Sequence, residues 1–179
     1  MAIFILILFL LLIAYGFLID HYRKAWNELS EFSGGTGVKI RASVIVAVRN
    51  EERNIGKLLD CLVAQNYPSY EIIIVDDHST DNTVNIVKEY PSVKIISLPE
   101  NIYGKKNAIK EGIKNSTGEL IITTDADCTM QPLWINTVVS FHHFSDAKFI
   151  AAPVNMKPGR SILSIFQSLD FLTLQGITG

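Results

Sequence analysis

Short apolar runs rich in β-branched residues alternate with segments of helical periodicity, and this alternation limits the fold more than any other feature. The strand-like runs are short and bounded by polar turns, and they cover residues 42–48, 71–75, 93–98 and 119–124. Helical spacing covers residues 55–63, about 79–90 and about 105–115. Repeated strand-helix units predict an α/β fold, a mostly parallel sheet flanked by helices on both faces.

Residues with known capping preferences indicate where these helices begin and end. Ser79 or Thr80 is expected to cap the second helix, because a side-chain oxygen there accepts a hydrogen bond from a free backbone N–H. The first helix is expected to stop before Tyr67 and Pro68, and Gly118 is expected to end the third.

An uncharged and almost wholly apolar stretch, residues 2–19, precedes this pattern. Its length lies within the ~17–25 residues that a helix needs to cross a bilayer. No basic residue precedes the stretch, whereas Arg23 and Lys24 follow it closely, so the positive-inside rule places the following domain in the cytoplasm. We therefore expect one transmembrane helix and a single-pass protein of an inner or plasma membrane.

Composition and turn residues divide the chain into three parts. The apolar content of 48% is concentrated in the first stretch, and the remainder has the composition of an ordinary globular domain. Gly, Ser and Thr gather at residues 31–37, which is typical of a flexible hinge. We expect an anchor over 1–20, a juxtamembrane linker over 21–38 and one domain over 39–179.

Charge and cysteine content exclude several classes of function. The net charge is -2 and the basic residues are scattered, which argues against a nucleic-acid partner. Cys61 and Cys128 have no CxxC or Cys/His spacing, so they are expected to be reduced, structural thiols.

Acidic side chains follow two of the predicted strands. Asp76 and Asp77 come after the second strand, and Asp125 and Asp127 come after the fourth. The carboxyl ends of parallel strands share one edge of the sheet, where ligands of such folds bind. Carboxylates gathered there repel each other unless a cation lies between them. Mg²⁺ or Mn²⁺ suits this site, since each prefers oxygen ligands and is often shared with substrate phosphates.

Two common phosphate-binding motifs are absent. No GxxxxGK[ST] occurs, and Gly35-Thr36-Gly37 precedes a strand where a dinucleotide fingerprint would follow one. Metal and lysine must then meet the phosphate charge. Lys105 and Lys106 open a predicted helix, where backbone N–H groups also favour anions, although a solvated helix start explains them equally well.

The chain resembles the nucleotide-sugar half of an inverting family 2 glycosyltransferase in two segments, SVIVAVRNEERNIGKLLDCLVAQNYPSYEIIIVDDHSTDNT and GKKNAIKEGIKNSTGELIITTDADC. The resemblance covers about residues 39–153, and the order and spacing of the motifs carry it. It implies the GT-A fold, a Rossmann-like α/β domain, and a nucleoside diphosphate sugar as ligand. Several membrane-anchored branches of the family make polysaccharides or glycolipids.

The resemblance also implies roles for residues at the ends of the first two strands. Ala47 and Glu51 are expected to line the nucleoside pocket, with Arg49 against the base. Asp77 matches the family residue that hydrogen-bonds the base, and Asp76 supports it.

The diphosphate end of the ligand falls to residues later in the chain. Lys105 matches a family lysine near the diphosphate, and Asp125 is expected to face the ribose or sugar. Asp127, with Asp125 beside it, is expected to bind a divalent metal, Mg²⁺ or Mn²⁺, that bridges both phosphates.

The implied chemistry is displacement at the anomeric carbon by a hydroxyl of a saccharide or lipid acceptor, with a nucleoside diphosphate, expected to be UDP, as leaving group. The family takes its carboxylate base from the second half of the domain. Asp146 and Asp170 are the acidic residues after Asp127, and neither lies where the family places its base. A QxxRW motif is also absent. We therefore expect a donor site whose acceptor half is missing, with residues 161–178 covering that half or lying on the membrane.

Three alternative functions stay open. A non-catalytic protein that binds nucleotide sugars would carry the same motifs. LIITTDADCT also fits the opening motif of a haloacid-dehalogenase phosphatase, with Asp125 as nucleophile and Asp127 as acid/base, but that motif normally occupies the first strand. IIIVDDHS resembles a receiver domain, whose acidic pair should likewise follow the first strand.

Other conspicuous side chains are expected to be structural. His142 and His143 are adjacent on a predicted helix, so they point in different directions and make a poor chelating pair. His78 fills a turn position. Aromatic residues at helical spacing are expected to pack on the sheet, and these are Trp134, Phe141 and Phe144.

Overall fold

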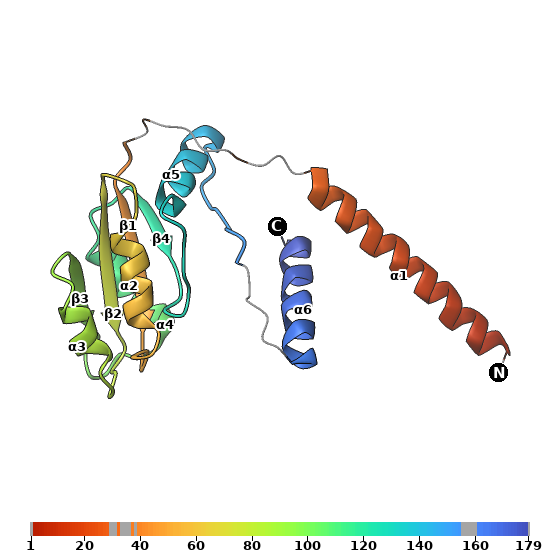
Figure 1. Ribbon diagram of the computed structural model, residues 1–179, viewed down its shortest axis with the longest axis horizontal. Helices are drawn as coiled ribbons and strands as arrows, with labels where there is room; N and C mark the ends of the chain where they lie inside the picture. Colours follow the sequence, from red (N-terminus) through yellow and green to blue (C-terminus); the bar gives the residue numbers. More distant parts are fainter. Residues whose placement is uncertain (1, 29–31, 33–36, 38, 155–160, 179) are drawn as a thin grey trace. The chain divides into compact units, whose positions relative to one another are not determined.

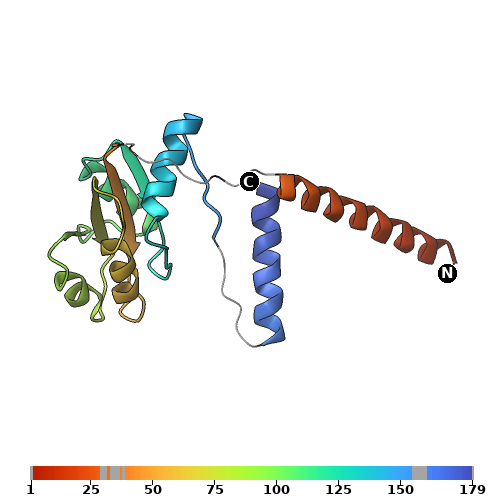
Figure 2. The ribbon, with the colours of Figure 1, turned by 45° about the horizontal axis from the view of Figure 1, so that its top comes forward.

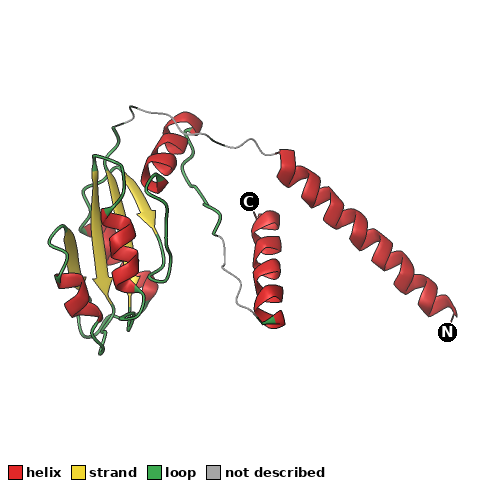
Figure 3. Cartoon of the chain, in the orientation of Figure 1, coloured by secondary structure: helices red, strands yellow, loops and turns green. Residues whose placement is uncertain are grey.

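Four parallel strands form the sheet that the alternating pattern predicts. The computed structural model describes residues 2–28, 32, 37, 39–154 and 161–178. The strands are β1 (Ala42–Val48), β2 (Tyr70–Asp76), β3 (Val93–Ser97) and β4 (Leu120–Thr123). Their order is β3-β2-β1-β4, and all of them point the same way (Figure 3). The expected α/β architecture is therefore confirmed.

Six helices accompany these strands within the described residues. They are α1 (Ala2–Glu28), α2 (Ile55–Val63), α3 (Thr83–Lys88), α4 (Lys105–Lys114), α5 (Trp134–Ser145) and α6 (Ile162–Thr178). The chain forms two compact units, one of residues 33–148 and one of residues 1–32 with 149–179. The first unit holds the whole sheet with α2 to α5, and the second holds α1 and α6. The extent of the predicted domain beyond residue 148 stays a prediction.

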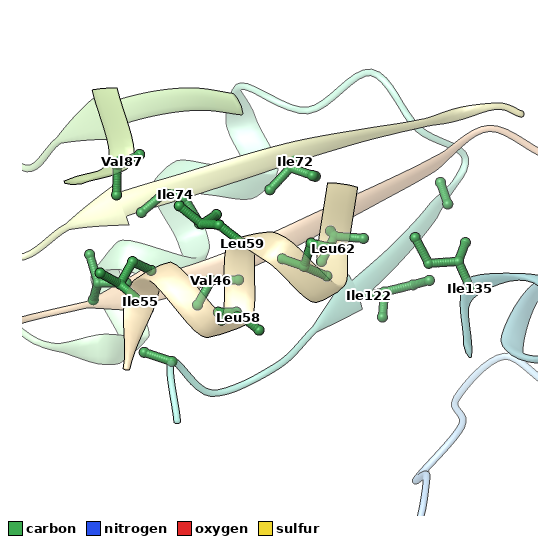
Figure 4. Packing of buried hydrophobic residues seen from close by; sticks show 14 of the residues in the cluster. Val46, Ile55, Leu58, Leu59, Leu62, Ile72, Ile74, Val87, Ile122 and Ile135 are labelled. Carbon is green, nitrogen blue, oxygen red and sulfur yellow. The ribbon is translucent and has the colours of Figure 1, made fainter. Parts of the chain in front are cut away.

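Alternation along β1 and β2 divides the core between the two faces of the sheet. Val44, Val46 and Ile74 belong to one buried cluster, together with the apolar face of α2. Figure 4 shows these α2 side chains lying over those of the two strands, and they are Ile55, Leu58, Leu59 and Leu62. The helix α5 lies beside β4 in Figures 1 and 2 and adds Ile135 to the same cluster.

The opposite face of the sheet is covered by α4 through very small side chains. Ala108 of α4 packs in a cluster with Ile45, Ile73 and Val75. A Cβ built on Gly112 would lie 2.4 Å from the Cγ2 atom of Ile45. This spacing lets the helix backbone approach the sheet closely, so α4 is held at a fixed height above β1 and β2.

Two predicted helix signals were wrong. The second helix begins at Thr83, with Asn82 at its N-cap, because Ser79 and Thr80 are engaged in a loop that is described below. The third helix ends at a C-cap of Asn115. Gly118 has a different role, since a Cβ there would lie 2.6 Å from the backbone nitrogen of Ser43. Gly118 thus permits close passage of the chain beside β1.

The N-terminal helix α1 continues past the predicted anchor boundary at residue 20 to Glu28. Asp20 forms ion pairs one turn ahead with Arg23 at 2.7 Å and Lys24 at 2.9 Å, and pairs at this spacing support helix. Residues 3–25 are long and apolar enough to cross a membrane by length and composition. The predicted hinge at 31–37 falls mostly outside the described residues.

We predict opposite effects of the same substitution in two helices. Gly112→Ala is expected to lower the free energy of unfolding by about 1–3 kcal/mol, because the new methyl group overpacks the contact with Ile45. Gly56→Ala is the matched control, since its Cβ would lie 3.8 Å from Ile86, and it should be neutral or stabilise by up to about 1 kcal/mol. Urea unfolding followed by tryptophan fluorescence measures both. Equal effects of the two variants would contradict the packing argument.

We also predict an acid-sensitive contribution from Glu71. Burial alone would raise the pKa of Glu71, but hydrogen bonds from the Ser43 hydroxyl (2.6 Å) and from the Thr117 N–H (2.6 Å) and hydroxyl (2.8 Å) hold it below its usual range. A lowered folded-state pKa stabilises the protein above the ordinary glutamate value of about 4.3, and the effect is lost as the pH falls through the folded-state pKa.

The Glu71→Gln variant is therefore expected to be less stable than the wild type by about 1 kcal/mol at pH 7, because the amide accepts weaker hydrogen bonds. The difference should shrink below about pH 4. Urea unfolding at a series of pH values measures it, with the exposed Glu89→Gln as control. A difference that does not change with pH would refute this account of Glu71.

Candidate functional site

A cavity of about 310 Å³ opens at the carboxyl ends of β1, β2 and β4. Because the strands are parallel, the loops that follow them meet at this one edge of the sheet. Its walls are Ala47, Val48, Arg49, Glu51, Asp77, Lys105, Asp125, Ala126 and Asp127. Of the residues singled out in the sequence for a ligand, the structure leaves Asp76 and Lys106 outside this lining and brings the others together.

Asp77 is the best-supported side chain of the cavity. The carboxylate is 8% exposed, and its Oδ2 atom accepts a hydrogen bond of 2.9 Å from the backbone N–H of Gly104. The Nη1 atom of Arg49 lies 3.8 Å from the same oxygen. Nδ1 of His78 lies 3.1 Å from Oδ1. These partners come from three different loops, so Asp77 connects the ends of β1 and β2 to the start of α4.

Asp76 stabilises the loop below the cavity. It is the last residue of β2 and is 5% exposed, and its two carboxylate oxygens accept hydrogen bonds of 3.2 and 3.4 Å from the backbone N–H of Ser79. The supporting role that the resemblance implies for Asp76 stays a prediction.

The loops after β1 and β2 are tied together by reciprocal hydrogen bonds that the sequence did not reveal. The backbone N–H of Asn50 donates to the Ser79 hydroxyl (3.0 Å), and the Asn50 side-chain oxygen accepts from the Thr80 N–H (2.8 Å). The backbone N–H of Glu51 donates to the Thr83 hydroxyl (2.8 Å). Asn50 has a φ of 55°, a conformation that Asn adopts more readily than most residues. In the sequence, Asn50 between a predicted strand and a predicted helix was the signal that could have indicated this loop contact.

Asp81 completes this pair of loops. Partial burial would raise its pKa, but hydrogen bonds from the Thr83 hydroxyl (2.5 Å) and Thr83 N–H (3.0 Å) hold the pKa below its usual range. The second oxygen of Asp81 accepts from the backbone N–H of Glu52 at 3.1 Å. The walls of the cavity are therefore set by side-chain bonds to backbone N–H groups.

Lys105 and Asp125 face each other across the mouth of the cavity. The Lys105 ammonium forms an ion pair with Oδ1 of Asp125, and both side chains are more than half exposed. Lys105 is the first residue of α4, and Gly104 before it has a φ of 94°, which favours glycine. An exposed pair of this kind contributes little stability, so the lysine is free to exchange partners.

Asp125 and Asp127 line the cavity from a turn that follows β4. β4 ends at Thr123, and the backbone N–H of Cys128 donates to the carbonyl oxygen of Asp125 at 3.3 Å. Between the two aspartates, Ala126 is 6% exposed and packs into the apolar core. Both carboxylates are exposed and line the cavity together with Ala126.

This donor set suits a divalent cation that is shared with a ligand. Among the described residues, no group of three or more His, Cys, Asp or Glu side chains is placed to hold a metal on its own. Mg²⁺ and Mn²⁺ are often held by one or two carboxylates together with phosphate oxygens. Asp125 and Asp127 are exposed carboxylates on one wall of the cavity and fit that arrangement.

The histidines have structural contacts. His78 has a φ of 60°, and its Nε2 atom is buried without a hydrogen-bond partner among the described residues, so it cannot reach a substrate. His142 Nδ1 lies 2.9 Å from the carbonyl oxygen of Ala147, and the ring of His143 lies against Phe144. The expectation that aromatic residues of α5 pack on the sheet holds for Trp134 and is wrong for Phe144, which is 63% exposed.

Comparison with known families agrees with this geometry. Residues 43–161 match glycosyl transferase family 2. The chain belongs to this family. The match runs through both of the segments on which the resemblance was based, so the GT-A fold is confirmed, and the phosphatase and receiver hypotheses lose their support.

Relatives in the family share this part of the fold. Poly-β-1,6-N-acetyl-D-glucosamine synthase of Staphylococcus epidermidis is 29% identical over 143 residues, which are 75% of this chain and 33% of the relative. Mannosyltransferase PcManGT of Pyrobaculum calidifontis was solved with GDP-Man and Mn²⁺. It has a TM-score of 0.60 at 27% identity, and the match covers 71% of this chain and 40% of the PcManGT chain.

A third relative is TarS of Staphylococcus aureus, solved with UDP-GlcNAc. It has a TM-score of 0.56 at 26% identity over 65% of this chain and 38% of the TarS chain. The chain spans about a third of the length of the first curated family 2 relatives that it matches.

Proposed function

We propose that the α/β unit binds a nucleoside diphosphate sugar and belongs to a glycosyltransferase that transfers the sugar, with inversion, to a saccharide or lipid-linked acceptor. One observation carries the proposal. Asp77, Lys105 and the pair Asp125 and Asp127 come from three separate segments and line a single cavity at the carboxyl edge of the sheet. Ligands of open parallel sheets bind at that edge, and this combination of charges suits a base, a diphosphate and a cation together.

The nucleoside occupies the part of the cavity formed by β1 and β2. Its base lies near Arg49 and hydrogen-bonds Asp77, while Ala47 and Glu51 form the wall beside it. A carboxylate offers about four acceptor positions, and Gly104 and His78 each use one on Asp77, so the remainder can accept from the base.

The diphosphate lies between α4 and the turn after β4. Lys105 exchanges Asp125 for a phosphate oxygen, at a helix start where backbone N–H groups also favour anions. Asp127, with Asp125 beside it, holds Mg²⁺ or Mn²⁺ when the metal binds. The metal supplies positive charge that stabilises the departing nucleoside diphosphate. UDP is the expected nucleotide. Relatives solved with UDP-GlcNAc and with GDP-Man make uracil and guanine the two bases to compare.

The acceptor's proton needs a base that we do not assign to the described α/β unit. Asp146 is the acidic residue of that unit after Asp127, and it ends α5 with an 86% exposed side chain. A hydrogen bond from Lys148 (2.8 Å) holds the pKa of Asp146 below its usual range, which makes it a weak base. A protein that binds nucleotide sugars without catalysis is the alternative, and release of UDP from UDP-GlcNAc distinguishes the two.

We predict that the full chain in detergent binds UDP in a Mn²⁺-dependent manner in calorimetric titration. Asp127→Asn removes the metal-binding charge without changing shape, and it is expected to weaken UDP binding at least about tenfold in the presence of Mn²⁺. Asp146→Asn is the control, because that carboxylate lies outside the cavity lining. UDP binding that is indifferent to both Mn²⁺ and Asp127→Asn would sink the proposed metal site. Absence of UDP and GDP binding would sink the proposed function.

We also propose that α1 anchors the protein in a membrane with its N-terminus outside. Residues 2–19 are uncharged, and at 1.5 Å per residue an apolar helix of this length approaches the ~30 Å thickness of the bilayer core. Arg23 and Lys24 follow the apolar stretch on the same helix, and by the positive-inside rule this supports a cytoplasmic α/β unit.

The chain's own cysteines provide a topology test. Cys61 and Cys128 are both free and partly exposed, and they are the chain's 2 cysteines. In spheroplasts, a membrane-impermeant maleimide should label them only after lysis. An added Ile3→Cys should be labelled without lysis. Labelling of Cys128 in intact spheroplasts would contradict the proposed orientation. Extraction of the chain by alkaline carbonate would contradict the proposed membrane anchor.

A further inference from the structure

The loop between β3 and α4 contacts the end of β2 at two neighbouring residues, His78 and Asp77. The ring of Tyr103 stacks on the ring of His78, with centroids 4.4 Å apart and planes at 29°. The next residue, Gly104, donates its backbone N–H to Oδ2 of Asp77 at 2.9 Å. The residue after that is Lys105, the first of α4. The stack therefore lies two residues from the lysine at the mouth of the cavity.

Among the described residues, His78 makes two contacts, the stack on Tyr103 and a hydrogen bond with Asp77. Its Nδ1 atom lies 3.1 Å from Oδ1 of Asp77, and because an ionised carboxylate only accepts, the ring must donate from Nδ1. Nε2 is buried and has no hydrogen-bond partner there. The φ of His78 is 60°, a positive value that is uncommon for a residue with a side chain. The backbone at this position therefore has a conformation that few residues adopt.

We infer that the His78–Tyr103 stack is a positioning element that fixes Lys105 and the start of α4 opposite Asp125, and so sets the preference for a nucleoside diphosphate over a nucleoside monophosphate. This inference rests on the proposed function. Asp77 directly follows β2, hydrogen-bonds His78 and accepts from Gly104, so loss of the stack frees the loop while Asp77 stays at the end of the strand. The part of the ligand that loses contacts is the diphosphate, because Lys105 moves with the loop.

The first measurement needs no ligand. Hydrogen exchange of the Gly104 amide, followed by NMR on the full chain in detergent, reports whether the loop stays docked on Asp77. Tyr103→Ala and His78→Asn are expected to speed this exchange by about three- to tenfold, since an aromatic pair contributes about 0.5–1.5 kcal/mol. Asn tolerates the positive φ at position 78, so that variant removes the ring without adding backbone strain.

Two variants serve as controls on the same loop. Tyr103→Phe keeps the ring and should preserve the wild-type exchange rate. Ile102→Ala changes a neighbouring side chain of 37% exposure without touching the stack, and it should also leave the rate unchanged. The double variant of His78→Asn and Tyr103→Ala should exchange no faster than the faster of the two single variants, because the stack that both remove can be lost only once. An unchanged rate in Tyr103→Ala, or additive effects in the double variant, would overturn the inference.

The second measurement compares the affinities of UDP and UMP, each with Mn²⁺. Tyr103→Ala and His78→Asn are expected to reduce the preference for UDP over UMP by about three- to tenfold, with UMP affinity little changed. If the wild type binds both nucleotides and the preference does not move, the link from the stack to the diphosphate is wrong. If the wild type binds neither, the proposed function fails, and the exchange rates alone decide whether the stack positions the loop.

Discussion

Close packing on both faces of β1 is the constraint on which the rest of the α/β unit depends. Val44, Ile45 and Val46 are fully buried, and neighbours along the strand face opposite layers of helix. Because β2 and β4 pair with β1 in parallel, any shift of its register would move both sets of loops at the carboxyl edge. The small residues Ala108 and Gly112 hold α4 close to the sheet, and α4 in turn carries Lys105.

Polar contacts at the two ends of the strands have different tasks. At the amino end, Glu71 joins Ser43 to Thr117 and stabilises the entry into β4. At the carboxyl end, Asp77 and Asn50 fasten loops that carry the cavity walls. In both places a side chain satisfies backbone N–H groups that no strand partner reaches, and burial makes an unsatisfied group costly. Rigid walls of this kind keep the charged groups of the cavity in place before a ligand arrives.

The family match concerns the α/β unit, whereas the short coverage of the relatives concerns the acceptor chemistry. The matched residues, 43–161, contain all of the sheet except Ala42 and every residue that lines the cavity. The proposed donor site therefore lies within the segment that matches the family. Acceptor chemistry belongs to the proposal, since the chain spans about a third of the first relatives' length. The His78–Tyr103 stack is argued from contacts of this chain alone.

The sequence by itself determined the parallel α/β fold, the buried faces and the gathering of Asp77, Asp125 and Asp127, because hydrophobic periodicity is visible along the chain and the carboxyl ends of parallel strands share one edge. Lys105 was assigned to the same site by the family resemblance. Only the tertiary structure decided the contacts between loops far apart in the sequence. Asn50 with Thr80, and Tyr103 with His78, meet because the sheet brings their loops together, and no periodicity records such a meeting. The false caps at Ser79 and Thr80 have the same origin, since tertiary hydrogen bonds took the groups that local capping would have used.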